Sequence, residues 1–246
     1  MAAYLRNCER HGPFRGDACP ECGSAGKLLM NDREIEAVGR ILAGMLRHFP
    51  DRYGIRLNEH GWARIYTIVP AIKAQKRQFG WISPYHIEAL AKTDPKERYQ
   101  VNDRKEIRAT YGHTIPIKID DFPSDGIPGI LYYQTTDEEM EFIPETGISP
   151  SDKTWVHLSS TYRKAYVAGL YHVDNPRVIG IDAAAMLEAG LDIRRATSDV
   201  YLTGEISPRF VVEVEREEVS LTEEEMREIE EVKTRRERKV HRDSSQ

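Results

Sequence analysis

Four side chains that bind soft metal ions lie within the first 22 residues of the 246-residue chain. They are spaced as Cys8-x2-His11 and Cys19-x2-Cys22, and they include all three cysteines of the sequence. Two such pairs can converge on one ion, and four nitrogen and sulfur ligands with no open position are typical of structural Zn²⁺. We therefore predict a zinc knuckle at the N-terminus.

The residues around these ligands favour the same interpretation. Gly12 and Gly23 each follow the second ligand of a pair, where the turn favours positive φ. So short a segment has almost no core, and the ion would supply most of its folding free energy. A disulfide is the alternative, although three cysteines cannot all pair and we expect a reducing compartment.

An arginine and a histidine stand side by side at the end of a helical pattern that starts near residue 32. Arg40 and Arg47 project from the side opposite the apolar stripe, and His48 lies at its border. Gly44 lies on the arginine side, where it leaves room for a ligand to approach the backbone. The stripe repeats at helical spacing and consists of Ile35, Val38, Ile41, Leu42, Met45, Leu46 and Phe49. From the helix alone, a solvated basic face with an incidental glycine is the simpler interpretation.

The segments that follow predict helices and a pair of strands. We expect a small hairpin or turn over 54–65, helices over 65–76 and 83–91, and strands over 98–101 and 106–109. Helices followed by a two-stranded wing are typical of a winged-helix fold, although a fold alone assigns no function. Arg108 leaves the second strand just before Gly112 and His113, which by itself is a weak motif.

Charge is divided unevenly along the chain. Residues 1–119 carry 20 Lys and Arg against 13 Asp and Glu, a balance of +7, whereas residues 120–219 carry 8 against 19, a balance of −11. A basic half joined to an acidic half suggests that the basic half meets a polyanion. Uneven charge with no partner is the alternative.

The second half predicts a mixed α+β lobe behind a linker rich in Pro, Gly and Asp at residues 115–129. The expected strands are 131–135, 155–159, 177–182, 199–202 and 210–214, and the expected helices are 136–147, 162–170 and 183–189. The chain contains neither G-x-G-x-x-G nor a P-loop motif, so neither nucleotide site is predicted. Residues 220–246 begin with a capping box at Thr222 and predict an exposed, highly charged helix that fades into a disordered tail.

Composition restricts the class of protein. The chain is 40% hydrophobic and 30% charged, as in soluble globular proteins. No apolar run reaches the roughly 18 residues that a membrane span needs, and the N-terminus lacks the apolar core of a signal peptide. We expect a cytoplasmic monomer.

Several short motifs occur in a fixed order along the chain. The first half contains Leu46-Arg47-His48-x-Pro50, Gly54-x-x-Leu57, Gly61-Trp62, Arg98-Tyr99 and Ile107-Arg108-Ala109-x-x-Gly112-His113. The second half contains Leu158-Ser159, Ile181-Asp182-Ala183 and Asp199-Val200-Tyr201-Leu202-Thr203. In this order and spacing they resemble the NAD-dependent RNA 2'-phosphotransferases, in their archaeal form, over about residues 33–214. The knuckle before them looks like an accessory module.

This resemblance implies a fold and a reaction. The fold is α+β, with the zinc knuckle, a winged-helix lobe and an ADP-ribosyltransferase-like mixed α/β lobe. An internal 2'-phosphate of RNA attacks the nicotinamide ribose of NAD⁺ and expels nicotinamide, and the ribose 2''-hydroxyl then attacks the phosphorus. The products are RNA with a 2'-hydroxyl and ADP-ribose 1'',2''-cyclic phosphate. The RNA would be transfer RNA, in splicing or related processing.

The resemblance also implies roles for residues of the first half. Arg47, His48 and Arg108 match the family's catalytic set, and we add His113 and Arg40 as residues that contact the RNA. Arginine holds a phosphate through paired N–H donors in fixed geometry. His48 either donates to a phosphate oxygen or transfers a proton.

The second half departs from the family pattern. The family's second-lobe arginine falls at Tyr171, and neither Arg163 nor Arg177 fits its place. Its usual His-Gly-Thr reads Tyr133-Gln134-Thr135. In place of its usual Arg-x-x-His the chain has Lys153-Thr-Trp-Val-His157, with three residues between the ends and not two. We interpret the chain as a variant subfamily. The residues expected to bind NAD are Tyr133, Thr135, His157, Ser159 and Tyr171.

These expectations divide the chain into four parts: a knuckle over 1–30, an RNA-binding lobe over 31–119, an NAD-binding lobe over 120–219, and a charged tail over 220–246. One alternative is a zinc-knuckle, winged-helix protein that binds nucleic acid without catalysis. A second alternative is an ADP-ribosyltransferase that acts on nucleic-acid phosphate. The first leaves the pairing of Arg108 and the Gly112-His113 turn with Arg47-His48 unexplained.

Overall fold

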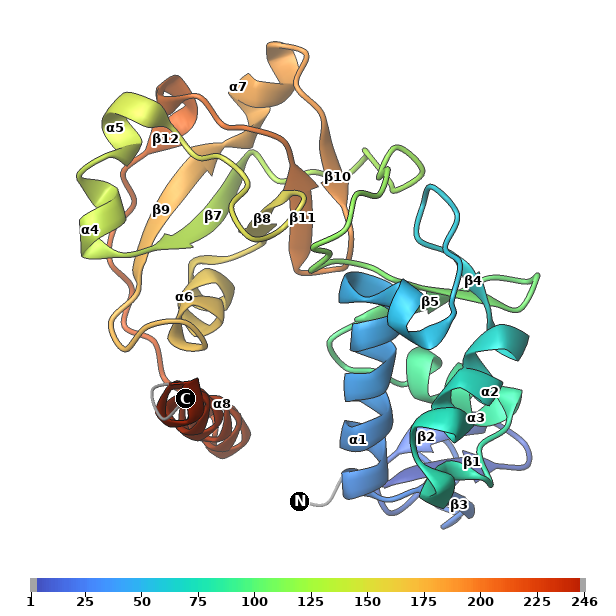
Figure 1. Ribbon diagram of the computed structural model, residues 1–246. Coiled ribbons are helices and arrows are strands. Elements are labelled where there is room, and N and C mark those ends of the chain that lie inside the picture. The colour runs from blue at the N-terminus through green and yellow to red at the C-terminus, as the bar shows by residue number, and fades with distance from the viewer. Residues whose placement is uncertain (1–3, 244–246) are drawn as a thin grey trace. The chain divides into compact units, whose positions relative to one another are not determined.

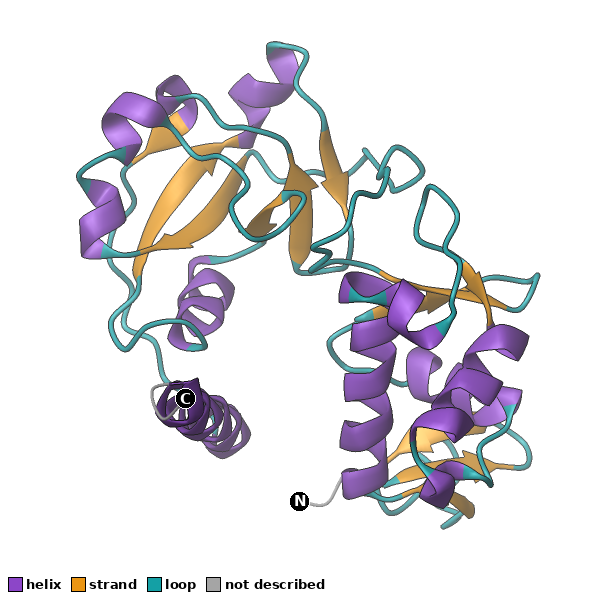
Figure 2. Cartoon of the chain, viewed as in Figure 1, coloured by secondary structure: helices purple, strands orange, loops and turns teal. Residues whose placement is uncertain are grey.

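The computed structural model describes residues 4–243, and in the last helix it describes side chains as far as residue 234. The chain forms two compact units, Met1–Asp121 with Asp152–Thr154, and Phe122–Ser151 with Trp155–Gln246. Figures 1 and 2 show the elements of each unit. Among the described residues, no helix combines the length and the apolar content needed to cross a bilayer.

The first unit begins with a small antiparallel sheet. It consists of β1 (Leu5–Cys8), β2 (Gly12–Arg15) and β3 (Lys27–Met30), in the order β2-β1-β3. Leu5 and Met30 are both fully buried in the main core of this unit. The segment is therefore more than a loop around an ion, because its sheet shares the core of the helices that follow.

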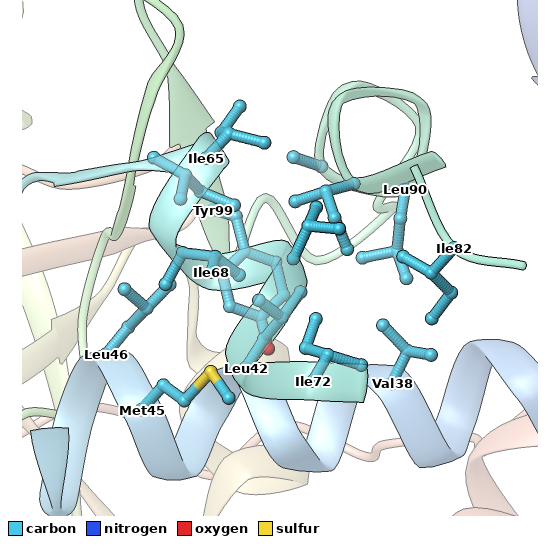
Figure 3. Packing of buried hydrophobic residues seen from close by; sticks show 14 of the residues in the cluster. Val38, Leu42, Met45, Leu46, Ile65, Ile68, Ile72, Ile82, Leu90 and Tyr99 are labelled. Carbon is cyan, nitrogen blue, oxygen red and sulfur yellow. The ribbon is translucent and has the colours of Figure 1, made fainter. Parts of the chain in front are cut away.

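The predicted first helix is present, and its last turn is altered. α1 (Asp32–Ala43) starts with a reciprocal capping box between Asn31 and Glu34, and continues into a π-helical turn, η1 (Gly44–His48), and a 3-10 turn, η2 (Pro50–Tyr53). The predicted stripe faces the core, where Val38, Leu42, Met45 and Leu46 are fully buried (Figure 3). The open space expected beside Gly44 is absent, since a Cβ there would lie 2.8 Å from the hydroxyl oxygen of Tyr53.

Two further helices and a three-stranded sheet complete the first unit. The helical segments are α2 (Ile65–Gln75), η3 (Arg77–Phe79) and α3 (Pro84–Lys92), and the strands are β4 (Ala63–Arg64), β5 (Tyr99–Val101) and β6 (Glu106–Ala109), in the order β4-β6-β5. Of the hairpin or turn predicted over 54–65, the structure has the turn at Asn58–Gly61. Asn58 accepts hydrogen bonds from the backbone nitrogens of His60 and Trp62, which makes a compact turn, and β4 then pairs with β6.

The second unit is built on a six-stranded sheet in the order β10-β11-β8-β7-β9-β12, with antiparallel pairing between neighbours. Its strands are β7 (Ile130–Thr135), β8 (Val156–Ser159), β9 (Arg177–Asp182), β10 (Ile193–Arg195), β11 (Val200–Thr203) and β12 (Val211–Val212). Its helical segments before residue 215 are α4 (Asp137–Met140), α5 (Ile143–Thr146), α6 (Tyr162–Leu170), α7 (Ala183–Glu188) and η4 (Pro208–Phe210). The helix predicted over 136–147 is two short helices, because Pro144 starts a new turn. The sequence did not predict β10.

The C-terminal helix α8 (Glu223–Asp243) belongs to the second unit and contacts α6. Arg163 of α6 pairs with Glu225 at 2.6 Å, and this hydrogen bond is the main cause that lowers the pKa of Glu225 to about 2. Ile229 is buried at 6% exposure. The first turns are mostly exposed, as predicted, but the helix is anchored on one side by Glu225 and Ile229. The predicted disordered tail beyond residue 243 lies outside the described residues.

Candidate active site and metal centre

The four predicted metal ligands meet at one point in the first unit. Their ligand atoms all lie within 4.8 Å of one another. The Sγ atom of Cys19 is 3.4 Å from Nδ1 of His11, and the Sγ atoms of Cys8 and Cys22 are 3.7 Å apart. Tetrahedral zinc with bonds of about 2.3 Å to sulfur places its ligands about 3.7 Å apart. The donor set and its spacing therefore fit zinc.

The turns that carry these ligands have the predicted geometry. Gly12 has a φ of +82° and Gly23 a φ of +72°, both in the left-handed region. Hydrogen bonds with Ser24 lower the pKa of the Cys22 thiol to about 5, and the thiolate is the form that binds metal. The three cysteines are free thiols, which excludes the disulfide alternative in this structure.

Arg47 lies at the end of η1 against two tyrosine rings. Its Cζ atom is 4.9 Å from the ring centre of Tyr111 and 5.9 Å from that of Tyr99. Cation–π contacts of this kind hold a guanidinium group by its face and leave its N–H donors for other partners. The arginine is therefore half-buried against aromatic rings, whereas the sequence predicted it on an outward face.

Two donors of Arg47 have no acceptor. Its Nε and Nη2 atoms are buried and have no hydrogen-bond partner among the described residues. Buried charged donors without acceptors are costly, and hydrogen bonds to a charged group contribute roughly 1.5–3 kcal/mol each. An oxyanion is the ligand that satisfies such a pair, because guanidinium binds phosphate through parallel N–H donors.

The strands β5 and β6 form what we call the wing, and the loop that follows them is bonded to the same helix end. The backbone nitrogen of Thr114 donates to the carbonyl oxygen of Arg47 at 3.0 Å, and the Thr114 hydroxyl lies 3.1 Å from Nδ1 of His48. Gly112 has a φ of +80°, and a Cβ there would lie 3.2 Å from Nη1 of Arg47. Glycine is thus required both by the turn and by the close approach of the arginine.

His48 is half-buried beside this loop. Burial lowers its pKa first, and the charges of Lys153 and Arg47 lower it further, while Asp152 acts in the opposite direction. The lowered pKa favours the neutral imidazole, which offers one donor and one acceptor. This is the state from which a histidine can accept a proton.

The two predicted RNA contacts of the first half have different surroundings. His113 is 2% exposed, and its Nε2 atom packs near Gly61, where a Cβ would lie 3.6 Å away. Arg40 lies on the exposed surface of α1, two helical turns before Arg47, and pairs with Glu36 at 2.7 Å. His113 therefore shapes the loop from within, and Arg40 is a surface charge.

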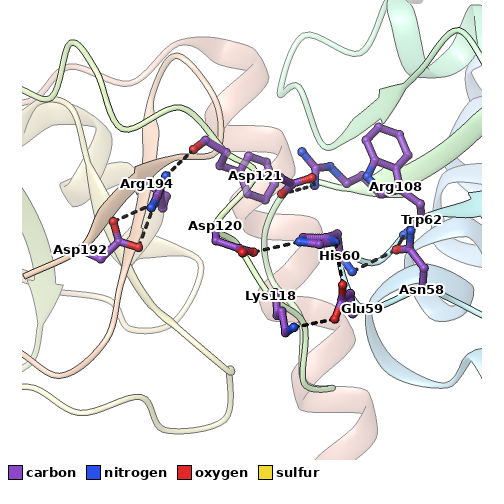
Figure 4. Close-up of polar contacts among 11 residues, drawn as sticks. Asn58, Glu59, His60, Trp62, Arg108, Lys118, Asp120, Asp121, Asp192 and Arg194 are labelled. Atoms are coloured by element: carbon purple, nitrogen blue, oxygen red, sulfur yellow. Dashed lines mark hydrogen bonds and ion pairs between the residues drawn. The ribbon is translucent and has the colours of Figure 1, made fainter.

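Arg108 occupies a different setting from Arg47. In β6 it alternates with core-facing residues, so its side chain leaves the other face of the sheet, where Gln100 lies opposite. Its Nη1 atom donates to both carboxylate oxygens of Asp121, at 2.8 and 2.7 Å (Figure 4). Its Nε atom donates to Gln100 at 2.9 Å. Its Cζ atom lies 4.5 Å from the centre of the Trp62 ring. The structure therefore joins Arg47 with His48 and gives Arg108 acidic and amide partners of its own.

The residues predicted to bind NAD divide between the two faces of the second sheet. Tyr133 packs on the core between the sheet and α4, α5 and α7, and Thr135, on the same face, donates to Glu139 of α4. His157 and Ser159 alternate with the core-facing Val156 and Leu158, and lie on the opposite face, where Ser159 is in register with Tyr132. That second face is the one that α6 covers, since Tyr162 of α6 makes an edge contact with the Tyr132 ring. A binding pocket on one face of this sheet can therefore include Tyr133 and Thr135, or His157 and Ser159, but not all four side chains.

Tyr171, at the end of α6, is engaged with the C-terminal helix. Its hydroxyl donates to Oε2 of Glu228 in α8 at 2.6 Å. Lys233 of α8 pairs with Asp174, which lies three residues after Tyr171 in the sequence. The position where the resemblance implies an arginine is therefore a tyrosine held by a carboxylate.

Sequence analysis missed several residues that build these sites. Tyr99 and Tyr111 flank Arg47, Thr114 fastens His48, and Asp121 binds Arg108. Tyr99 is part of the Arg98-Tyr99 motif and Thr114 directly follows the Gly112-His113 motif, so the motifs themselves were a signal for both. The pairing of Asp121 with Arg108 depends on how the linker folds back, which local patterns do not encode.

Comparison with known proteins gives a consistent result. A family model described as RNA 2'-phosphotransferase, Tpt1/KptA family, matches residues 32–205. The chain is 53% identical over 231 residues to a probable RNA 2'-phosphotransferase of Thermoplasma acidophilum, covering 94% of this chain and 97% of that protein. It is 49% identical over 229 residues to a protein of the same description from Thermoplasma volcanium, covering 93% and 96%. A probable RNA 2'-phosphotransferase 1 of Archaeoglobus fulgidus is 36% identical over 207 residues, covering 84% and 93%.

Proposed function

We propose, since this chain belongs to the Tpt1/KptA family of RNA 2'-phosphotransferases, that it removes an internal 2'-phosphate from RNA by transferring it to NAD⁺. The products are RNA with a 2'-hydroxyl, nicotinamide and ADP-ribose 1'',2''-cyclic phosphate. The enzyme is a transferase, and NAD⁺ is its co-substrate. The observation that connects this proposal with particular residues is that two buried N–H donors of Arg47, Nε and Nη2, lack an acceptor among the described residues.

The proposed roles in the first unit follow from the chemistry of these side chains. Arg47 binds the 2'-phosphate through Nε and Nη2, because a phosphate offers the two oxygens that this pair of donors needs. Neutral His48 lies next to Arg47 and donates a hydrogen bond to a phosphate oxygen or accepts a proton. Holding the phosphate in a fixed orientation is where most of the acceleration arises in phosphoryl transfer.

Arg108 takes part once the phosphate competes with Asp121. The Asp121 side chain is 35% exposed, so its carboxylate can move into water when a dianion takes its place. We assign Arg108 the role of a second phosphate ligand on this basis. His113 supports the loop that carries Thr114.

The second unit is proposed to bind NAD⁺ as an ADP-ribosyltransferase-like lobe. Its six-stranded antiparallel sheet with short flanking helices supports that assignment. Of the predicted residues, His157 and Ser159 share one face with Tyr132 and are the better candidates for the pocket. Tyr133 and Thr135 support the sheet from behind.

The first unit is proposed to be a winged-helix RNA-binding lobe over residues 31–119 that carries an N-terminal zinc knuckle. Its three helices and its β4-β6-β5 sheet support the first part, and the four converging ligands support the second. The NAD-binding lobe is assigned to 120–219 and the charged segment to 220–246. We further propose a cytoplasmic monomer that acts on transfer RNA during splicing.

The zinc assignment has a direct test. Protein purified without chelator should contain one zinc ion per chain, measured by elemental analysis. Removing the ion should lower the unfolding temperature, because β1 and β3 share their core with α1. A metal-free preparation with unchanged stability would remove the knuckle from this account.

The activity has a test that separates it from simple binding. A short RNA with one internal 2'-phosphate is incubated with the protein and NAD⁺, and both nicotinamide and RNA phosphate are followed. One nicotinamide should appear for each phosphate lost, and neither should change with 2'-hydroxyl RNA or without NAD⁺. Phosphate loss without NAD⁺, or no loss at all, would refute the proposed function.

A further inference from the structure

Residues 152–154 belong to the first unit, although the chain on both sides of them belongs to the second. The backbone nitrogen of Thr154 donates to the carbonyl oxygen of His113 at 2.9 Å, and its hydroxyl donates to the carbonyl oxygen of Ile115 at 2.8 Å. A short return of the chain is therefore fixed to the loop that follows the wing. From sequence this segment read only as the approach to His157.

These bonds bring Lys153 into the surroundings of His48. Thr154 pairs with His113, and the next residue, Thr114, pairs with Arg47 and His48. The closeness of the lysine is also seen in its charge acting on His48 together with that of Arg47. Arg47, His48 and Lys153 thus form one cluster of nitrogen-bearing side chains around residues 113–114.

Lys153 is free to exchange its present partner. Its side chain is 31% exposed and its ammonium donates to Oδ2 of Asp152 at 2.6 Å, while the Asp152 side chain is 74% exposed. A pair of neighbouring residues with one member in water is held weakly. A phosphate dianion bound at Arg47 competes well for the ammonium, because it carries more charge than a carboxylate.

We infer that Lys153 is a further ligand of the RNA 2'-phosphate, which completes with Arg47 and His48 a clamp of three side chains in the first unit. The inference rests on the proposed function. It deepens that function by adding a cation whose position is set by the return of residues 152–154, and not by the helix or the wing. It also adds a positive charge to the clamp. The arginine that the resemblance implies at position 171 of the second unit is here a tyrosine, and its hydroxyl is bound to Glu228.

The test compares Lys153→Ala with Lys153→Arg, and with Lys73→Ala, which removes an exposed lysine of α2, as a matched control. Each is assayed at constant salt with RNA that carries one internal 2'-phosphate. Lys153→Ala should lower kcat/KM by about 10- to 100-fold, the effect of losing one charge-assisted hydrogen bond. Lys153→Arg should recover most of the loss, and Lys73→Ala should match the wild type.

A second readout does not depend on turnover. The pKa of His48, measured by NMR, should rise in Lys153→Ala and return in Lys153→Arg, because the neighbouring cation is lost and restored. If the wild type is active but Lys153→Ala keeps full kcat/KM, the inference is overturned. If the wild type shows no NAD-dependent turnover, the proposed function fails, and the inference is then tested by binding alone. In that case, a Lys153→Ala variant that still prefers phosphorylated over unphosphorylated RNA as strongly as the wild type would overturn the inference.

Discussion

The helix end and the wing of the first unit hold their arginines in opposite ways. Arg47 at the helix end is gripped by the faces of two tyrosines, and its Nε and Nη2 atoms lack acceptors within the described chain. Arg108 on the wing is also buried, at 4% exposure, but Asp121 and Gln100 accept its hydrogen bonds. An arginine with open donors is prepared for an anion, whereas a satisfied arginine must first release one.

Burial therefore has different consequences for Arg108 on the wing and for Arg47 at the helix end. At the wing, burial is balanced by an ion pair and stabilises the fold. At the helix end, burial leaves a cost that only a ligand removes, and the tyrosine rings fix the guanidinium where that ligand arrives. The comparison therefore predicts that activity and stability respond differently to the two substitutions.

The largest expected effect is on turnover. Arg47→Ala should lower kcat for NAD-dependent phosphate removal roughly 100- to 1000-fold, as loss of a preorganised donor at a developing charge does. Arg108→Ala should also reduce turnover, but less, because Arg108 joins only after Asp121 moves away. The measurement is single-turnover release of nicotinamide, with Arg33→Ala, an exposed arginine of α1, as control. An equal or larger loss in Arg108→Ala would reverse the ranking.

The second effect is on stability and runs in the opposite order. Arg108→Ala should lower the free energy of unfolding by about 2 kcal/mol, since it removes hydrogen bonds to a charged group and the stacking on Trp62. Arg47→Ala should cost less, about 1 kcal/mol, because it loses the contacts with the Tyr99 and Tyr111 rings while its donors Nε and Nη2 bond nothing in the described structure. Urea unfolding near pH 7.5 measures both. Equal losses in the free energy of unfolding would mean that the hydrogen bonds of Arg108 do not stabilise the fold more than the environment of Arg47 does.

The smallest effect concerns His48 and pH. Its pKa in the folded protein is lowered, by burial first and by the charges of Lys153 and Arg47 next, with Asp152 opposing them. The unfolded chain, with a pKa of about 6.5, therefore binds the proton more readily. Stability from this group is present above pH 6.5 and is lost as the pH falls through the folded pKa.

His48→Gln should remove that part of the acid sensitivity. Urea midpoints measured from pH 8 down to pH 5 should fall less steeply in the variant than in the wild type, and the two should run parallel above pH 7. Parallel curves over the whole range would show that the environment of His48 does not disfavour its charged form.

Local patterns predicted the elements of this protein well where one rule decides the outcome. The capping box at Asn31 and the spacing of buried residues from Val38 to Leu46 fix α1, and Pro84 fixes the start of α3. The ligand spacing at Cys8 and Cys22, with glycine after each pair, was enough to predict a converging metal site. These are effects within a few residues of sequence.

The sequence did not predict the surroundings of a residue where these are formed by segments far away in the chain. Tyr53 fills the space beside Gly44, Asp121 returns to Arg108, and Glu228 reaches Tyr171 across many residues. Alternation along a strand shows that Tyr133 and Ser159 lie on different faces only when the register of β7 against β8 is known. The catalytic roles of Arg47, His48 and Arg108 stay predictions, because they came from the family resemblance.

The most direct test of the central claim is equilibrium binding at fixed salt, without NAD⁺, of RNA with one internal 2'-phosphate and of the same RNA with a 2'-hydroxyl. The wild type and Arg33→Ala should prefer the phosphorylated RNA, and Arg47→Ala should lose that preference while it still binds the RNA backbone. A full preference for the phosphate in Arg47→Ala would contradict the account, because the 2'-phosphate would then be held somewhere other than the end of the first helix.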